Sequence, residues 1–87
     1  MKEYGIIYYS RAEKELGGSN KKETRVIYDK ISRLKHHPHP QMAIKLKGYE
    51  YHRLRVGIYR VIYQIDEENR RIIVISIKHR SKAYDNL

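Results

Sequence analysis

Three consecutive segments with strand periodicity fill the chain between Tyr51 and Arg80, and they restrict the possible folds more than any other feature. The segments "YHRLR" and "IYRVIYQI" are separated by the short turn "VG", which predicts a hairpin. The polar turn "DEEN" leads into "RRIIVISIKHR", whose apolar middle predicts a central strand. A chain of 87 residues with three such strands has room for one small domain.

The residues before the hairpin begin with one more strand and a short helix. "EYGIIYY" over residues 3–9 is rich in strand-forming residues. Ser10 and Glu13 lie three residues apart, which is a capping-box pattern, and they predict a helix over residues 10–16. Two glycines follow and end this helix.

A second, longer helix comes next. Asn20 and Glu23 repeat the capping pattern, and apolar residues at helical spacing continue the helix to about Lys35. The prolines of "HHPHP" end it. The predicted fold is α+β: a small single domain over residues 1–87, in the order β-α-α-β-β-β, with two helices packed on one face of an antiparallel sheet.

Basic residues are concentrated in the predicted sheet. The chain has a formal net charge of +9. Residues 1–41 are mixed, whereas residues 42–65 hold five Lys or Arg and one acid, and residues 69–84 hold five and no acid. A small domain with this charge attracts polyanions, although the same charge can simply keep a surface soluble. All nine aromatic residues are tyrosines, whose rings can stack on bases.

Alternation along the strands assigns these charges to a face. In "IYRVIYQI" the tyrosines share one face and Arg60 lies on the other. The same rule groups Ile73, Ile75 and Ile77 in the last strand. Because helices can cover only one face, we expect the uncovered face to show four arginines, whose counter-charges come from a ligand: Arg53, Arg55, Arg60 and Arg80.

The motifs "KLKGY", "RxRVGxYRVIY" and "HRxxxY" together resemble the RelE/ParE superfamily of toxin–antitoxin toxins, on the side of the RelE-like mRNA interferases. The resemblance extends over nearly the whole chain. It implies a RelE-like fold and a type II toxin that acts as a ribosome-dependent endoribonuclease and so inhibits translation. It also implies two kinds of partner, a cognate antitoxin in a hetero-oligomeric complex and the ribosome with mRNA in its 30S A site.

The resemblance also implies roles for particular residues. By motif position, Arg60, Arg80 and Tyr84 are the catalytic residues, and His52 is a possible general base. Six basic residues are expected to bind RNA: Arg53, Arg55, Lys45, Lys47, Lys78 and Lys82. The chain departs from the family in two places, since "YHRLR" lacks the usual pair of lysines and Lys78 stands where glycine is frequent.

The expected reaction uses the RNA's own 2′-OH as nucleophile. An arginine fork can hold two oxygens of the reacting phosphate. Tyr84 could take a proton, stack on a base or only anchor the tail, and His79 is interpreted as structural. No acidic cluster lies near the basic strands and the histidines of "HHPHP" share one loop, so the sequence predicts neither a metal nor another cofactor.

Two other functions stay open at the level of sequence. A ParE-like protein would inhibit DNA gyrase by contact without catalysis, and a degenerate member would mainly bind an antitoxin. The set of Arg60, Arg80 and Tyr84 favours the nuclease. The chain has no cysteine, no signal-peptide pattern and no apolar run near the ~18 residues of a membrane span, which predicts a cytoplasmic protein.

Overall fold

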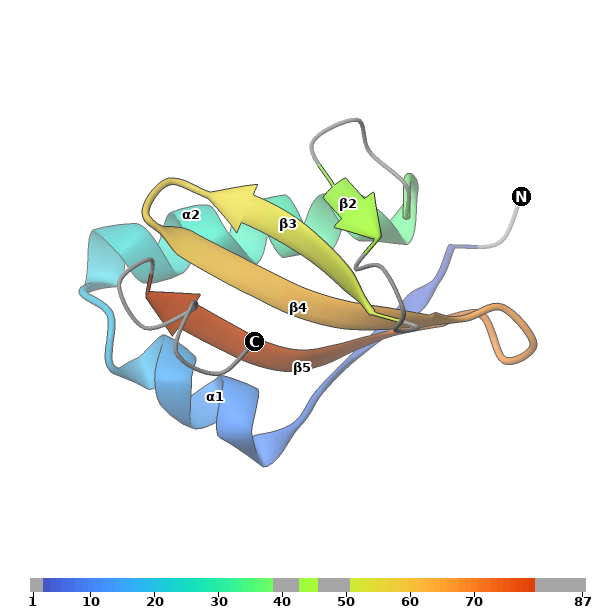
Figure 1. The fold of residues 1–87 in the computed structure, drawn as a ribbon, viewed down its shortest axis with the longest axis horizontal. Helices are drawn as coiled ribbons and strands as arrows, with labels where there is room; N and C mark the ends of the chain where they lie inside the picture. Colours follow the sequence, from blue (N-terminus) through green and yellow to red (C-terminus); the bar gives the residue numbers. More distant parts are fainter. Residues whose placement is uncertain (1–2, 39–42, 46–50, 80–87) are drawn as a thin grey trace.

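The computed structural model describes residues 3–38, 43–45 and 51–79 (Figure 1). In these ranges the elements are β1 (Gly5–Tyr8), α1 (Ser10–Gly17), α2 (Lys21–Ser32), β2 (Ala43–Lys45), β3 (His52–Val56), β4 (Tyr59–Asp66) and β5 (Arg71–His79). A short 3₁₀ helix, Arg33–Lys35, extends α2. The predicted α+β fold class and order of elements are confirmed, with β2 as an additional short strand. No helix in the described ranges is long and apolar enough to cross a membrane.

The strands form one sheet in the order β1-β5-β4-β3-β2. The pairs β2–β3, β3–β4 and β4–β5 are antiparallel, as predicted. The first strand differs, because β1 runs parallel to β5, with Gly5 opposite Arg71 and Tyr8 opposite Val74. The sheet is therefore mixed. Side chains alternate in the same way in both kinds of pairing, so the sequence pattern of β1 could not reveal its direction.

The sequence signals for the start of the two helices differ in accuracy: one is confirmed and the other is wrong. The capping box of α2 is confirmed, because the Asn20 side chain accepts from the Glu23 amide at 2.8 Å and the Glu23 carboxylate accepts from the Asn20 amide at 3.3 Å. The predicted cap of α1 is wrong, since Ser10 is already inside the helix and Tyr9 is the N-cap. Gly57 has φ +59° in the two-residue turn between β3 and β4, a conformation that favours glycine.

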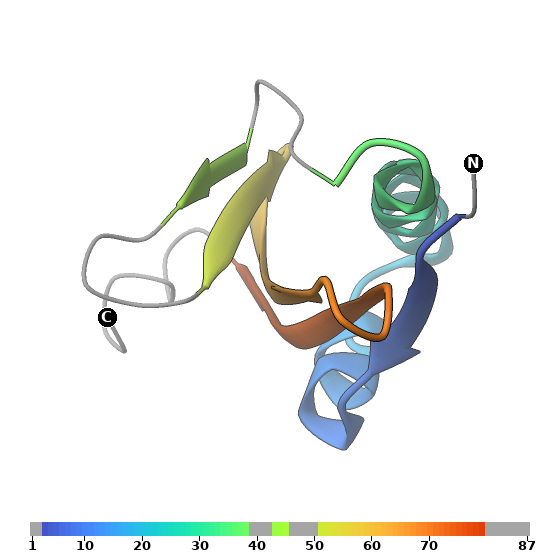
Figure 2. The ribbon, with the colours of Figure 1, turned by 90° about the vertical axis from the view of Figure 1, so that its right-hand side faces the viewer.

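Both helices bury residues in the hydrophobic core that they form with the strands. Ala12 and Leu16 of α1 are buried, as are Ile27 and Ile31 of α2. Figure 2 shows α2, in teal, against one side of the curled sheet, while α1 lies beside the C-terminal half of β5 (Figure 1). Leu34 of the 3₁₀ helix is also buried in this core. The strands supply the remaining core residues: Leu54, Val56, Val61, Tyr63, Ile72, Val74 and Ile77.

A β-bulge in β5 changes which isoleucines face this core. Tyr63 lies opposite Val74, but the preceding residue, Ile62, lies opposite Ser76. Ile75 is therefore an extra residue on β5, and the alternation of faces is reversed beyond it. Ile72, Val74 and Ile77 lie in the core, so the predicted grouping of Ile73, Ile75 and Ile77 on one face is wrong.

Candidate functional site

Basic side chains of three neighbouring strands form a row on the face of the sheet that turns away from the core. The strand register places Arg55 of β3 opposite Arg60 of β4, and Arg60 opposite Lys78 of β5. Arg53 lies two residues from Arg55 on the same face. Their sequence neighbours Leu54, Val56 and Val61 belong to the core, which fixes the direction of the alternation. We call Arg53, Arg55, Arg60 and Lys78 the basic row.

The members of the basic row differ in exposure. Arg55 is exposed and Arg53 is half-buried, and neither side chain has a polar partner among the residues that the structure describes. Arg60 is only 3% exposed, which corrects the expectation of an open arginine at this position. An arginine stays charged when buried, and Arg60 interacts with another group of the protein. The row thus combines one buried guanidinium with two that are available to a ligand.

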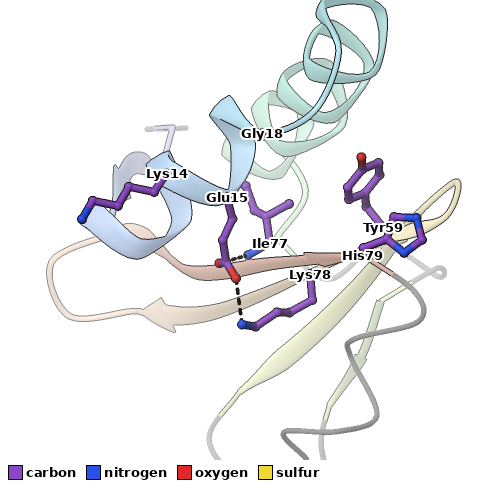
Figure 3. Close-up of a pocket in the computed structure, with 7 residues that line it drawn as sticks. All are labelled: Lys14, Glu15, Gly18, Tyr59, Ile77, Lys78 and His79. Atoms are coloured by element: carbon purple, nitrogen blue, oxygen red, sulfur yellow. Dashed lines mark hydrogen bonds and ion pairs between the residues drawn. The ribbon is translucent and has the colours of Figure 1, made fainter.

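Glu15 of α1 holds the end of the basic row at the free edge of β5. Its carboxylate accepts hydrogen bonds from the Ser76 hydroxyl at 2.9 Å and from the Ile77 amide at 2.9 Å. The Lys78 ammonium lies 2.8 Å from its other oxygen (Figure 3). The strand β1 pairs only with residues 71–74 of β5, so it does not reach the Ile77 amide. The Glu15 carboxylate accepts this hydrogen bond in place of a strand partner. Sequence reasoning missed this contact because the residues lie 61 or more positions apart.

Burial alone would raise the pKa of Glu15, but the hydrogen bonds from Lys78, Ile77 and Ser76 together lower it. A lowered carboxyl pKa adds stability above the unfolded-state pKa, and this stability is lost as the pH falls through the folded-state pKa.

We therefore expect Glu15→Gln to lower the free energy of unfolding at pH 7 by about 1–3 kcal/mol, the scale of a lost charged hydrogen bond. The difference from the parent should shrink as the pH falls below about 4.5. Urea unfolding at several pH values measures both effects. Glu13→Gln, at an exposed position of the same helix, is the matched control and should change little. An equal loss at every pH would contradict the role assigned to the Glu15 charge.

His52 lies on the opposite face from the basic row. It pairs with Tyr63 in the sheet, and the two rings stack with centroids 5.3 Å apart. Tyr63 is fully buried and donates its hydroxyl proton to the Pro38 carbonyl at 2.9 Å. Burial raises the pKa of Tyr63 to about 12. The structure therefore separates His52 from the arginines, and we do not retain it as a general base.

A second aromatic pair lies at the end of the sheet, on the face opposite the basic row. The rings of Tyr59 and His79 meet edge to face with centroids 5.5 Å apart. Tyr59 donates its hydroxyl proton to Glu23 of α2 at 3.1 Å. Burial and this hydrogen bond raise the pKa of Tyr59, so its phenol stays protonated. The pairing agrees with the structural interpretation of His79, although the side chain is exposed.

Several other predicted site residues are not placed in the basic row by the structure. Four of them lie outside the described residues: Arg80, Tyr84, Lys47 and Lys82. Lys45 lies in β2, opposite His52. The structure thus brings together Arg53, Arg55, Arg60 and Lys78.

Comparisons with known proteins identify relatives over most of the chain. The family model described as the ParE toxin of the type II toxin–antitoxin system parDE matches residues 4–84. The archaeal RelE–RelB complex from Pyrococcus horikoshii contains a chain that matches with a TM-score of 0.82 and 28% identity, covering 93% of this chain and 99% of that one. A comparison with curated protein sequences gives no significant match.

Chains from two further complexes have the same fold as this protein. The intact RelBE toxin–antitoxin complex of E. coli matches with a TM-score of 0.76 and 25% identity, covering 87% of this chain and 95% of that one. The RelBE2 complex of Mycobacterium tuberculosis matches with a TM-score of 0.81 over 90% of this chain and 99% of that one, and at 20% identity it supports the fold alone.

Proposed function

The chain belongs to the ParE toxin family of type II toxin–antitoxin systems, within the RelE/ParE superfamily, and from this premise we propose that it is a ribosome-dependent endoribonuclease that cleaves mRNA in the cytoplasm. The family resemblance drawn from the sequence motifs is confirmed. The cleavage reaction and its dependence on the ribosome are the proposal.

The observation that carries the proposal is the basic row. Arg55, Arg60 and Lys78 stand side by side across three strands, on the face that the core does not use. Lys78 forms an ion pair with Glu15. Arg53 and Arg55 have no polar partner among the residues that the structure describes. Such a row suits the regularly spaced phosphates of a nucleic acid backbone. A single strand fits better than a duplex, because a nuclease must turn the reacting phosphate for in-line attack.

The chemistry requires one bond to form and one to break. The RNA 2′-oxygen attacks the adjacent phosphorus as its proton leaves, and the bond from phosphorus to the 5′-oxygen breaks as that oxygen gains a proton. The products are a 2′,3′-cyclic phosphate and a 5′-hydroxyl. We assign Arg60 and Arg80 to the negative charge that grows on the phosphate oxygens, since a guanidinium donates two parallel hydrogen bonds. Arg53 and Arg55 hold the neighbouring phosphates, and Tyr84 serves the proton transfers.

A cognate antitoxin is the second proposed partner. The solved relatives from Pyrococcus horikoshii and E. coli are complexes of RelE with RelB. The net charge of +9 and the basic row would be complemented by an acidic segment that becomes ordered on binding. Such a segment would compete with RNA for the same face.

One observation favours a second candidate function. The matching family model is that of ParE, and the alternative considered from the sequence is a ParE-like protein that inhibits DNA gyrase by contact. A contact inhibitor has no need of a buried Arg60 beside two further arginines, and we therefore place the nuclease first.

A translating cell extract separates the two functions. We expect the protein to cut translated mRNA, so that new 5′ ends map within codons of the open reading frame. Supercoiling of plasmid DNA by purified gyrase should stay unchanged under the same conditions. Arg25→Ala, which removes an exposed arginine of α2, is the control and should cut like the parent. Gyrase inhibition with intact mRNA would reverse the assignment.

A further inference from the structure

A polar pocket opens between α1 and the end of the sheet, next to the basic row (Figure 3). Its volume is about 580 Å³, within the range of pockets that hold small ligands. The described residues that line it come from α1 and its C-cap, the start of β4 and the end of β5: Lys14, Glu15, Gly18, Tyr59, Ile77, Lys78 and His79.

The two ends of the pocket differ in chemistry. At one end lies the ammonium group of Lys78 beside the Glu15 carboxylate, and at the other lie the rings of Tyr59 and His79, while the Lys14 side chain extends outward at the rim with its ammonium away from Lys78 (Figure 3). Lys14 has no polar partner in the described part of the chain, and Lys78 gives Glu15 one contact while an ammonium carries three donors. Two cations against one carboxylate leave the pocket positively charged.

The aromatic end offers a corner built from two rings. The planes of Tyr59 and His79 are inclined by 83°, so a flat group that stacks on one ring meets the edge of the other. The hydrogen bond from Tyr59 to Glu23 of α2 fixes the first ring. Stacking on such rings is the usual way in which proteins hold unpaired bases without reading their sequence.

We propose that this pocket is a subsite for one nucleotide of single-stranded RNA, next to the nucleotide whose phosphate lies on the basic row. A nucleotide has an anion at one end and a flat ring system at the other, which matches the cationic end and the aromatic end of the pocket. Lys78 holds its phosphate, Lys14 at the rim binds the RNA backbone beside it, and the corner of Tyr59 and His79 holds its base. Lys78 belongs to both the pocket and the basic row, so the strand passes from one to the other around the edge of β5. The inference rests on the proposed function, because it needs RNA as the ligand.

The test measures binding of a short fluorescein-labelled single-stranded RNA whose 2′-oxygens are methylated, so that it cannot be cleaved. Fluorescence anisotropy at several salt concentrations gives the dissociation constant and its salt dependence. Lys14→Met should weaken binding severalfold and reduce the slope of log K against log salt by about 0.7, the share of one phosphate contact. His79→Ala should weaken binding about fivefold or more through lost stacking. Lys30→Met, at an exposed position of α2, is the matched control and should bind like the parent in affinity.

Arg55→Met separates the inference from the proposed function. If Arg55→Met binds more weakly while Lys14→Met and His79→Ala bind like the parent, RNA lies on the basic row but not in the pocket, and the inference is overturned alone. If Arg55→Met also binds like the parent, the basic row is not an RNA site, and both fall. Thermal melting of each variant shows whether the fold is kept.

Discussion

Arg60→Ala should lower the rate of mRNA cleavage on programmed ribosomes by about 10²-fold or more, the scale seen when one charge-stabilising donor is removed. Arg60 is buried at the centre of the basic row, so its side chain has little room to move before RNA arrives. The transition state carries more negative charge on the phosphate than the ground state does, and the loss should therefore fall on the cleavage step. Single-turnover kinetics with excess toxin measure that step directly.

Ribosome binding should change much less, because other Lys and Arg contacts support it. Arg60→Lys should recover only part of the rate, since lysine keeps the charge but loses the planar fork. Arg80→Ala should reproduce the loss, because the motif resemblance places that arginine at the same phosphate. Arg25→Ala controls for the loss of one positive charge elsewhere on the surface. An Arg60→Ala variant that binds ribosomes poorly but cleaves at the parental rate once bound would show a binding role only.

Ile31→Asp should destabilise the protein by about 4 kcal/mol or more, because it buries an unpaired charge. Ile31 is 0% exposed in the core between α2 and the sheet. A small domain is stable by only about 5–15 kcal/mol, so the variant should be largely unfolded in mild denaturant. Urea unfolding followed by circular dichroism gives the difference in free energy.

Val26→Asp is the matched control for this variant. Val26 lies on the same helix and is 46% exposed, so the same substitution places the new charge in water and should cost little. Equal loss in the two variants would contradict the assignment of the buried face of α2.

The elements that the sequence predicted correctly are those with strong local signals. The capping box of Asn20 and Glu23 sets the start of α2, and the positive φ of Gly57 sets the β3–β4 hairpin, whose turn is Gly57 and Ile58, one residue later than the predicted "VG". Alternation in β3 and β4 correctly separated Arg53, Arg55 and Arg60 from the core. These features depend on residues within a few positions of one another, which is why a single sequence reveals them.

The features that were missed depend on distant contacts. The parallel pairing of β1 with β5 has no signature in either strand, and the bulge at Ile75 is visible only in the register against β4. The burial of Arg60 and the position of His52 on the core side follow from what packs against each face. Alternation assigned the faces of β3 and β4 correctly, but it carries no information about a bulge or about what covers each face.

The end groups of the RNA fragments show whether the protein cuts mRNA through attack by the 2′-OH. Purified parent protein is mixed with ribosomes programmed with a defined mRNA, and the fragments are analysed for their termini. We predict fragments with a 2′,3′-cyclic phosphate and a 5′-hydroxyl, formed with programmed ribosomes and not with the mRNA alone. Intact mRNA on ribosomes that have bound the protein, or fragments with a 5′-phosphate, would contradict the proposed reaction.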